Sequence, residues 1–398
     1  MLPSNVVIVT VDCLRAEDWE NISSPSPEGT DSIKMISPGG ATRYSMPAIL
    51  TGSHVSEMGG YPSIEGVPTL ANILNNAGYD THFLHGNPWL NSEYGFGPFR
   101  DIYAPTVDGS DIHASSNNGD ESENLTSLLD DYLPDSISSI AYPLKYRLLD
   151  APKVGAENLV DEAISRLSSD ENTAVWLHLM DLHRPYSVVP RNPLSLDYYR
   201  LLRFTRPEFF DLPADARPLI QETYKKNLQL VSRELGRLVD EAVDNDTLWI
   251  LTSDHGEEFG NEGNWFHRND RLNNELLNVP FEIRSPSDVI DVEGPVSGLD
   301  IAPTIARVLG DSLENTRGVP LQNGGSKFPT AEVHTQDRHH LFVTNGDENI
   351  VRTKPPESPE NKLEAKALDV FESATQNEQT TIDEAAQKRL QRLGYVDL

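Results

Sequence analysis

The chain has 398 residues, enough for one large α/β domain or two smaller ones with a substantial core. Its formal net charge of −30 argues against binding to nucleic acid or to an anionic membrane surface, because the long-range field of the protein repels both. The acidic residues are spread along the sequence, which favours a halophilic protein whose surface stays hydrated at molar salt, where the Debye length is about 3 Å.

Cysteine usage and the first residues bear on the cellular compartment. Cys13 is the only cysteine, so the chain cannot form an internal disulfide and nothing points to an oxidising compartment. Residues 1–5 carry no basic side chain ahead of the apolar run 6–11, which is too short for a signal peptide and far too short to span a bilayer. We therefore expect a cytoplasmic, soluble protein without a transmembrane segment.

The first predicted strand ends in a carboxylate. Residues Asn5–Val11 are β-branched after the first, which is typical of a central parallel strand buried on both faces. Asp12 follows directly, so it either caps the next segment or belongs to a site at the carboxyl edge of the sheet. Residues 20–40 are rich in Ser, Pro, Gly and Asp and are predicted to form a loop.

A threonine precedes the first predicted helix. In residues 41–52, Ser45 is a good N-cap and Pro47 suits the first turn of a short helix. Thr42 would then lie just ahead of a helix N-terminus, where backbone amides and the helix dipole favour an anion. A threonine hydroxyl is a poor nucleophile until a metal lowers its pKa or a base removes its proton, and the alternative is a plain loop residue.

The middle of the chain alternates helices and strands. The predicted elements are a helix at 68–77 ended by Gly78, a strand at 79–84, a helix at Ala156–Leu167, a strand at 173–180 and a long helix at 219–243. His178 lies inside its strand and is predicted to be structural, whereas Asp181 and His183 follow the strand end. Residues 101–150 and 184–217 lack periodicity and are predicted to be irregular insertions, the second a candidate lid.

An Asp-His pair follows the next predicted strand. The apolar run 248–251 predicts a buried strand, and Asp254, His255 and Gly256 come shortly after it. A carboxylate and an imidazole at the carboxyl edge of a sheet suit a divalent cation. The alternative is that Asp254 caps a helix and His255 is a surface turn residue.

The C-terminal part is more polar. A strand through 275–283 and a helix from Asp300 to near Gly310 complete the larger region. Residues 341–345, 350–352 and 388–395 predict a small α+β unit, with a charged linker at 353–361. We therefore predict a catalytic domain at 1–318 and a small C-terminal α+β subdomain at 319–398. The sequence contains no internal repeat and no glycine pattern for binding nucleotides.

Seven short motifs occur along the chain in the order of a known family. They lie at residues 9–15, 42–52, 68–81, 181–186, 252–260, 275–280 and 300–304. Together they resemble the sulfatase-like branch of the alkaline phosphatase superfamily, and the terminal Leu393-Gly394-Tyr395 is similar to a common ending of archaeal members. The resemblance implies an α/β fold with a mostly parallel central sheet sandwiched by helices.

The same resemblance implies a metal and nucleophile centre. Asp12, Asp254 and His255 would bind a divalent metal together with the nucleophile, which in family sulfatases is a formylglycine made from Cys or Ser in a Cys/Ser-x-Pro-x-Arg motif. Counted back from residues 51–52, that position is Thr42. A threonine there resembles the nucleophile of family phosphodiesterases and phosphotransferases.

Other positions of the family sulfatases also differ. Tyr44 and Met46 replace the proline and arginine of the formylglycine motif, and Cys13 lies outside it. Gly86 and Pro88 replace the sulfate-binding Lys-x-His of many sulfatases. These departures argue against sulfatase activity.

The leading hypothesis is metal-dependent hydrolysis of an anionic substrate, a phosphate mono- or diester, through a phosphothreonine at Thr42. His183 would protonate the leaving oxygen or complete a second metal site with Asp181. His267 is a candidate ligand of the transferring group or of the second ion, and Arg43 a candidate anion clamp.

Three alternatives remain at the sequence level. The first is a sulfuric ester hydrolase without formylglycine, and the second is a transferase that moves a phospho-headgroup between lipids or glycans. The third is a non-enzymatic protein that binds metal or glycan. Asp, His and Thr ligands permit Ca²⁺, Mg²⁺, Mn²⁺ or Zn²⁺, and the sequence gives no oligomeric state.

Overall fold

The structure is a computed structural model. It describes residues 2–22, 25–58, 67–87, 90, 96–104, 154–169, 172–184, 186, 214, 216–260, 263–286, 290, 294–313, 315–334 and 339–374. Most of the predicted insertion at 101–150, most of the candidate lid at 184–217 and the predicted unit at 388–395 lie outside these residues.

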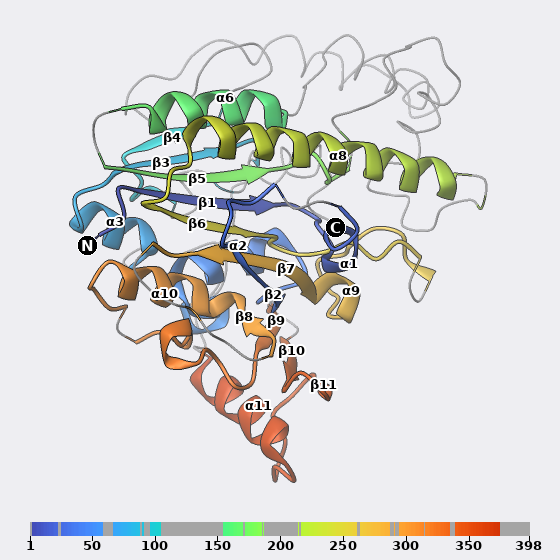
Figure 1. Cartoon of the computed structure of the whole chain (residues 1–398). Helices are drawn as coiled ribbons and strands as arrows, with labels where there is room; N and C mark the ends of the chain where they lie inside the picture. The colour runs from blue at the N-terminus through green and yellow to red at the C-terminus, as the bar shows by residue number, and fades with distance from the viewer. Residues whose placement is uncertain are drawn as a thin grey trace, which may run out of the picture.

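An eight-stranded sheet forms the centre of the molecule, in the order β4-β3-β5-β1-β6-β7-β2-β8 (Figure 1). The strands are β1 (Asn5–Val11), β2 (Asp31–Ile36), β3 (Asp80–His85), β4 (Asp101–Tyr103), β5 (Thr173–Leu179), β6 (Thr247–Thr252), β7 (Asn278–Arg284) and β8 (Val296–Ser297). The pairs from β4 to β6 are all parallel, while β7 runs antiparallel to both β6 and β2. The mostly parallel sheet predicted from the sequence is therefore confirmed.

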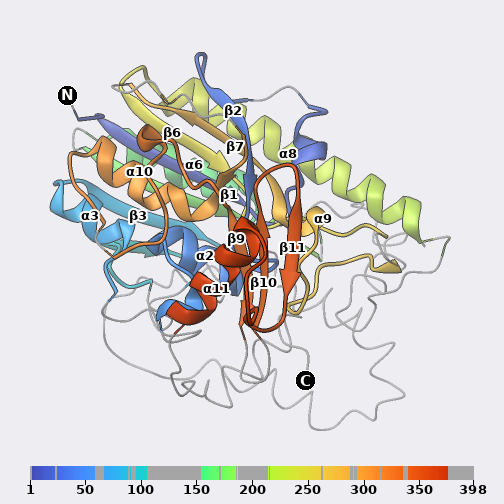
Figure 2. The same cartoon turned by 90° about the horizontal axis from the view of Figure 1, so that it is seen from below.

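Helices cover both faces of this sheet. On one face lie α2 (Thr42–Thr51), α3 (Leu70–Asn76) and α10 (Ile301–Val308), and on the other lie α6 (Ala156–Leu167) and α8 (Arg217–Ala242). Strand β1 shows why, because Val6 and Ile8 belong to the first apolar cluster whereas Val7 and Val9 belong to the second. Figure 2 shows the two groups of helices on opposite sides of the sheet.

None of the helices in the described ranges is long and apolar enough to cross a lipid bilayer.

A second, three-stranded antiparallel sheet lies in the C-terminal part. It consists of β9 (Thr330–His334), β10 (His339–Thr344) and β11 (Asn349–Arg352), and α11 (Lys362–Ser373) packs on one of its faces. Ala331 and Phe342 pack with Ile36 and Leu277 of the larger part. Figure 1 shows the small sheet beyond β8, at the end of the main sheet. The division into 1–318 and 319–398 stays a prediction.

Two short helices, α1 (Ala16–Trp19) and α9 (Asn274–Leu277), and three 3-10 turns, η1 (Val55–Met58), η4 (Gly298–Asp300) and η5 (Leu321–Asn323), complete the described elements.

Two local predictions were wrong, and one helix was not predicted. The predicted loop at 20–40 contains β2. Most of the first four residues of β2 are exposed and polar, so its sequence resembles that of a loop. The predicted insertion at 101–150 begins with the short strand β4, whose pairing with β3 depends on tertiary contacts. After the predicted linker at 353–361, α11 follows, and its N-cap Asn361 accepts a hydrogen bond from Glu364 N.

Helix α2 also begins one turn earlier than predicted. Its N-cap is Ala41, and Ser45 lies inside the helix, where its Oγ donates to the Ala41 carbonyl at 3.1 Å. Pro47 is likewise internal, so the Arg43 carbonyl four residues earlier receives no amide hydrogen bond from it. Thr42 is consequently the first residue of the helix and does not precede it.

Candidate active site

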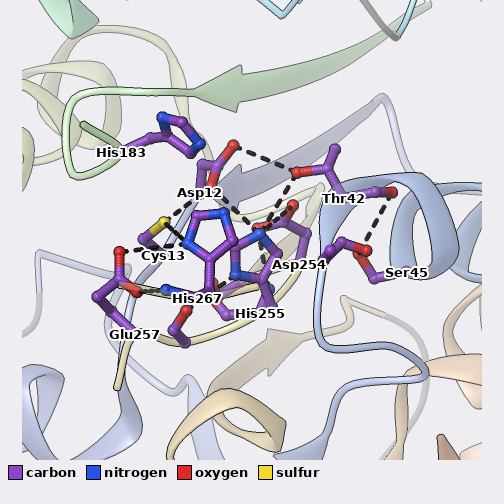
Figure 3. Close-up of polar contacts among 12 residues, drawn as sticks. Asp12, Cys13, Thr42, Ser45, His183, Asp254, His255, Glu257 and His267 are labelled. Atoms are coloured by element: carbon purple, nitrogen blue, oxygen red, sulfur yellow. Dashed lines mark hydrogen bonds and ion pairs between the residues drawn. The ribbon is translucent and has the colours of Figure 1, made fainter. Parts of the chain in front are cut away.

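Two neighbouring strands bring the principal polar side chains together. Strand β1 lies between β5 and β6, and its parallel register pairs Thr10 with Thr252 of β6. The carboxyl ends of β1 and β6 are therefore adjacent, and Asp12 and Asp254 both have 0% of their surface exposed. One ligand atom each from Asp12, Asp254 and His255 lies within 4.8 Å of the others. Figure 3 shows the three side chains pointing toward one another.

The chain after β6 holds the His255 ring in one orientation. Nδ1 of His255 donates to the Gly256 carbonyl at 2.8 Å, because a carbonyl can only accept. Nε2 then carries the lone pair, and it lies 3.5 Å from Asp12 Oδ1 and 3.6 Å from Asp254 Oδ2. Gly256 is required here, since a Cβ at this position would collide with the Glu275 carbonyl oxygen.

Thr42 enters the site from the first turn of α2. Its Oγ1 lies 3.4 Å from Asp12 Oδ2 and 3.4 Å from His255 Nε2 (Figure 3). The side chain is 5% exposed, so the hydroxyl is almost enclosed by these groups. Just before the helix, the backbone of Gly40 lies so close to the Arg271 carbonyl oxygen that a Cβ at this position would collide with it. The structure thus brings together the four residues that the sequence predicted as metal ligands.

The pKa values of Asp12 and Asp254 are shifted in opposite directions. Burial raises the pKa of Asp12, but His183, His178 and His255 more than offset it and hold that pKa well below its usual value. Burial and the negative charge of Asp12 raise the pKa of Asp254. Burial lowers the pKa of His255, yet the two carboxylates outweigh it and the net pKa is raised.

These donors fit a divalent cation. No described residue donates a hydrogen bond to Asp254 Oδ2, which is buried, and a buried carboxylate oxygen without a partner is costly. A cation held by Asp12, Asp254 and His255 would satisfy it. The set of oxygen and nitrogen donors is compatible with Ca²⁺, Mg²⁺, Mn²⁺ or Zn²⁺.

A second group of donors adjoins the first. Cys13 Sγ donates to Asp12 Oδ1 at 3.1 Å and lies 3.5 Å from His267 Nδ1. The His267 ring centroid is 5.1 Å from that of His183 and 4.4 Å from that of His255. Burial, together with the carboxylates of Asp12, Glu257 and Asp254, raises the pKa of the Cys13 thiol well above its usual value.

Sequence reasoning missed two residues of this second group. Cys13 lies outside the formylglycine motif, and its position next to Asp12 is the sequence signal that could have identified it. Glu257 was passed over in the Asp-His-Gly-Glu-Glu run, and its Oε2 lies 3.2 Å from His267 Nδ1. Its Oε1 also accepts a hydrogen bond from the His267 backbone amide.

Asp181 and Arg43 have other contacts in the structure, while His178 Nε2 lies 3.5 Å from Asp12 Oδ2. Asp181 Oδ2 accepts a hydrogen bond from the Ala156 amide at 3.0 Å, at the start of α6. The Arg43 guanidinium lies 4.7 Å from the centre of the Tyr44 ring and donates to its hydroxyl. The metal and anion roles of Asp181 and Arg43 stay predictions. His178 is buried as predicted, with Nδ1 2.9 Å from Thr10 Oγ1.

Comparison with known proteins gives a family match over most of the chain. A family model described as Sulfatase matches residues 4–311. The choline-sulfatase of Rhizobium meliloti (strain 1021) is 30% identical over 194 residues, which cover 42% of this chain and 37% of that protein. The low-salt glycan biosynthesis sulfotransferase Agl7 of Haloferax volcanii is 31% identical over 153 residues, which cover 36% of this chain and 35% of that protein. The matches thus span little more than a third of the length of these curated relatives.

Solved structures share the architecture. The phosphonate monoester hydrolase SpPMH from Silicibacter pomeroyi has a TM-score of 0.62 at 17% identity, covering 88% of this chain and 87% of that chain. At this level of identity the likeness concerns the fold, and it agrees with the predicted alkaline phosphatase-like α/β architecture.

Proposed function

This chain belongs to the sulfatase family, and on that premise we propose that it is a metal-dependent hydrolase of phosphate mono- or diesters with Thr42 as the nucleophile. The observation that carries the proposal is the position of the Thr42 hydroxyl, 3.4 Å from both Asp12 Oδ2 and His255 Nε2. The hydroxyl group of a threonine therefore lies beside a cluster of buried metal-binding side chains.

The nucleophile favours phosphorus over sulfur. A hydrated formylglycine carries two hydroxyls, so it can release a bound sulfo group by re-forming its aldehyde. Threonine has one hydroxyl and no such route, and the only cysteine, Cys13, points toward Asp12 and His267. A phosphothreonine can instead be resolved by attack of water at phosphorus, which supports a phosphate ester as the substrate.

The first chemical step forms a bond between Thr42 Oγ1 and phosphorus and breaks the bond to the leaving oxygen, which keeps the electron pair. The Thr42 proton leaves to solvent, because the Asp12 carboxylate, 3.4 Å away, has a lowered pKa and is a weak base. The N-terminus of α2 presents the positive end of its dipole to the non-bridging oxygens. A divalent cation bound by Asp12, Asp254 and His255 would add fixed positive charge that favours the threonine alkoxide.

In the second step water attacks phosphorus, the bond to Oγ1 breaks with its electron pair on Oγ1, and Thr42 takes up the proton that the water loses. His183 and His267 lie on the far side of Asp12 from Thr42 (Figure 3). We propose that the leaving oxygen lies on this side, where its negative charge is neutralised either by a proton from His183 or by a cation that His183 would bind.

A substrate panel tests the proposal. Aryl phosphate, aryl phosphodiester and aryl sulfate would be compared in molar potassium chloride, because a net charge of −30 favours a halophilic protein. We expect phosphate ester turnover that falls by about a thousandfold or more in Thr42→Ala.

Thr51→Ala is the matched control for this panel. Thr51 lies on the same helix, and its hydroxyl donates to the Pro47 carbonyl outside the site. This variant should keep wild-type turnover. Turnover of the sulfate ester alone, or an active Thr42→Ala, would defeat the proposal.

Transfer to an alcohol is the second candidate activity. It is favoured by the similarity to a protein named as a glycan biosynthesis sulfotransferase. The same phosphothreonine would then be resolved by a lipid or glycan hydroxyl instead of water. Product analysis with an added alcohol acceptor separates the two, since a transferase forms a new ester faster than free phosphate.

A further inference from the structure

His178 is a buried polar side chain beside the proposed nucleophile, and the mechanism above does not use it. It lies in β5, pairs in register with Thr10 of β1, and is 0% exposed. Trp176 and Ile8 on these strands pack in the first apolar cluster, so the alternation of side chains places His178 and Thr10 on the same face of the sheet as α2. The ring therefore lies on the face from which Thr42 enters the site.

An indole sets the direction of the hydrogen bonds that reach this ring. Trp176 Nε1–H can only donate, and it donates to Thr10 Oγ1 at 3.1 Å. The Thr10 hydroxyl in turn lies 2.9 Å from His178 Nδ1 and 3.2 Å from the Leu177 carbonyl oxygen. Its single proton can go to either acceptor. The first choice leaves the proton of the ring on Nε2, and the second requires it on Nδ1.

The surroundings of Nε2 decide between these two tautomers. Nε2 lies 3.5 Å from Asp12 Oδ2, and it has no hydrogen-bond partner of ordinary length among the described residues. A proton on Nε2 places a positive N–H dipole beside the carboxylate, whereas a bare Nε2 would place a lone pair beside a negatively charged oxygen. Both side chains are 0% exposed, so water screens this difference little. The arrangement in which Thr10 donates to Nδ1 is therefore favoured.

The two oxygens of the Asp12 carboxylate have different neighbours. Oδ2 lies 3.4 Å from Thr42 Oγ1 and 3.5 Å from His178 Nε2. Oδ1 accepts from the Cys13 thiol at 3.1 Å and lies 3.5 Å from His255 Nε2. Rotation of the carboxylate about its Cβ–Cγ bond would exchange these surroundings. Donors on both sides oppose that rotation, and such groups behind a metal ligand commonly set the affinity for the metal.

A neighbouring histidine in the same row provides a comparison. His85 of β3 pairs in register with His178 and is 1% exposed. Its ring stacks on Phe83 with the centroids 4.6 Å apart, and within the described ranges neither of its nitrogens has a hydrogen-bond partner. The two rings share burial and sheet position, but that of His178 lies one strand closer to Asp12. A role that depends on Asp12 should therefore distinguish them.

We propose that His178 is a positioning residue: it carries its proton on Nε2 and thereby holds the Asp12 carboxylate in the orientation that serves Thr42 and the divalent cation. The Thr10 hydroxyl, oriented by the indole of Trp176, fixes that tautomer. The proposal rests on the proposed function for the role of Thr42, but not for the contacts of His178. It gives this buried histidine a role in the site beyond the structural one predicted from the sequence.

Nitrogen-15 NMR of the imidazole rings reads the tautomer directly. The sample is the full-length protein stripped with a chelator, and because the chain has 11 histidines, the His178 signals are identified by their absence from His178→Gln. We expect a protonated Nε2 and a bare Nδ1 in wild type and in Thr10→Ser. Thr10→Val, which lacks the hydroxyl, should lose this preference. A wild-type ring protonated on Nδ1 alone overturns the proposal.

Calorimetric titration with Mn²⁺ measures the consequence without a substrate. We expect His178→Phe to bind Mn²⁺ about 10- to 100-fold more weakly than wild type. His178→Gln, whose amide can still donate to Asp12, should recover part of this loss. Thr10→Val leaves the ring in place, so it should weaken binding less, and it carries the test if His178→Phe does not fold. His85→Phe is the matched control and should bind Mn²⁺ as wild type does.

Turnover separates this proposal from the proposed function. At saturating Mn²⁺, His178→Phe should lower kcat by about tenfold and leave KM within about twofold, because Asp12 Oδ2 also lies beside Thr42. Wild-type affinity for Mn²⁺ in His178→Phe overturns the positioning role even if Thr42-dependent phosphate turnover persists. A protein with the Nε2 tautomer and the expected loss of affinity that hydrolyses no phosphate ester supports the positioning role and refutes the proposed function.

Discussion

Replacing Glu332 with glutamine should weaken the contact between the small sheet and the catalytic part. Glu332 lies on β9 and is 1% exposed. Its Oε1 accepts from the Ser56 amide at 2.9 Å, and its Oε2 accepts from Ser56 Oγ at 2.6 Å. His339 Nε2 lies 3.0 Å from Oε2. A buried carboxylate is thus stabilised by groups from both parts of the chain.

The magnitude follows from the pKa of this carboxyl. Burial raises the pKa of Glu332, but His54, His339 and Ser56 more than offset it and hold it at about 2, against an ordinary value of 4.5. At about 1.4 kcal/mol for each pH unit, the difference corresponds to about 3 kcal/mol of folding stability. Because the folded-state pKa is lowered, this contribution is present above pH 4.5 and is lost as the pH falls through 2.

Chemical denaturation of wild type and Glu332→Gln in molar salt measures the effect. We expect the variant to be less stable by up to about 3 kcal/mol near pH 5, where histidines are more fully charged than at neutral pH, and by about half as much near pH 3. Glu348→Gln, at an exposed position in the turn after β10, is the matched control and should change little. An equal stability gap at both pH values, or none near pH 5, would refute the reasoning.

Three further outcomes test the site itself. Chelation should lower phosphate ester turnover by about a hundredfold or more. Adding Zn²⁺ or Mn²⁺ should restore the turnover of wild type but not that of Asp254→Asn. Turnover that is insensitive to the chelator would contradict the metal requirement. Thr42→Ser keeps the hydroxyl, so its kcat should stay within about tenfold of the wild-type value. Equal activities of the serine and alanine variants would exclude a nucleophile at this position. Gly256→Ala should reduce the metal content, and it should lower the free energy of unfolding by about 3 kcal/mol, because the added Cβ collides with the Glu275 carbonyl oxygen. An unchanged denaturation midpoint would show that the loop can shift.

Several elements could be predicted because their pattern is local. Strand β1 and helix α6 have the predicted bounds, since an unbroken β-branched run and a 3.6-residue apolar period are visible in a short window. Strand β2 could not be predicted in this way. Its partner strand β7 lies far away in the sequence, and its own exposed residues are polar.

The candidate site was predictable to the extent that strand ends mark it. Asp12 and Asp254 follow neighbouring parallel strands, so their proximity follows from the topology once β1 and β6 are adjacent. Glu257 was not predicted, because its relevance depends on a side-chain direction that no spacing reveals, whereas the place of Cys13 next to Asp12 is a signal that the sequence contains. The metal role that the place of Asp181 after β5 suggested stays a prediction, and one of its carboxylate oxygens contacts the start of α6.

The stereochemical course at phosphorus tests the central claim most directly. Hydrolysis of an ester with a chiral, isotopically labelled phosphorus involves two in-line displacements if Thr42 forms a covalent intermediate, and each one inverts the configuration. The account therefore predicts overall retention of configuration in the product. Overall inversion, which a direct attack of water produces, would contradict it.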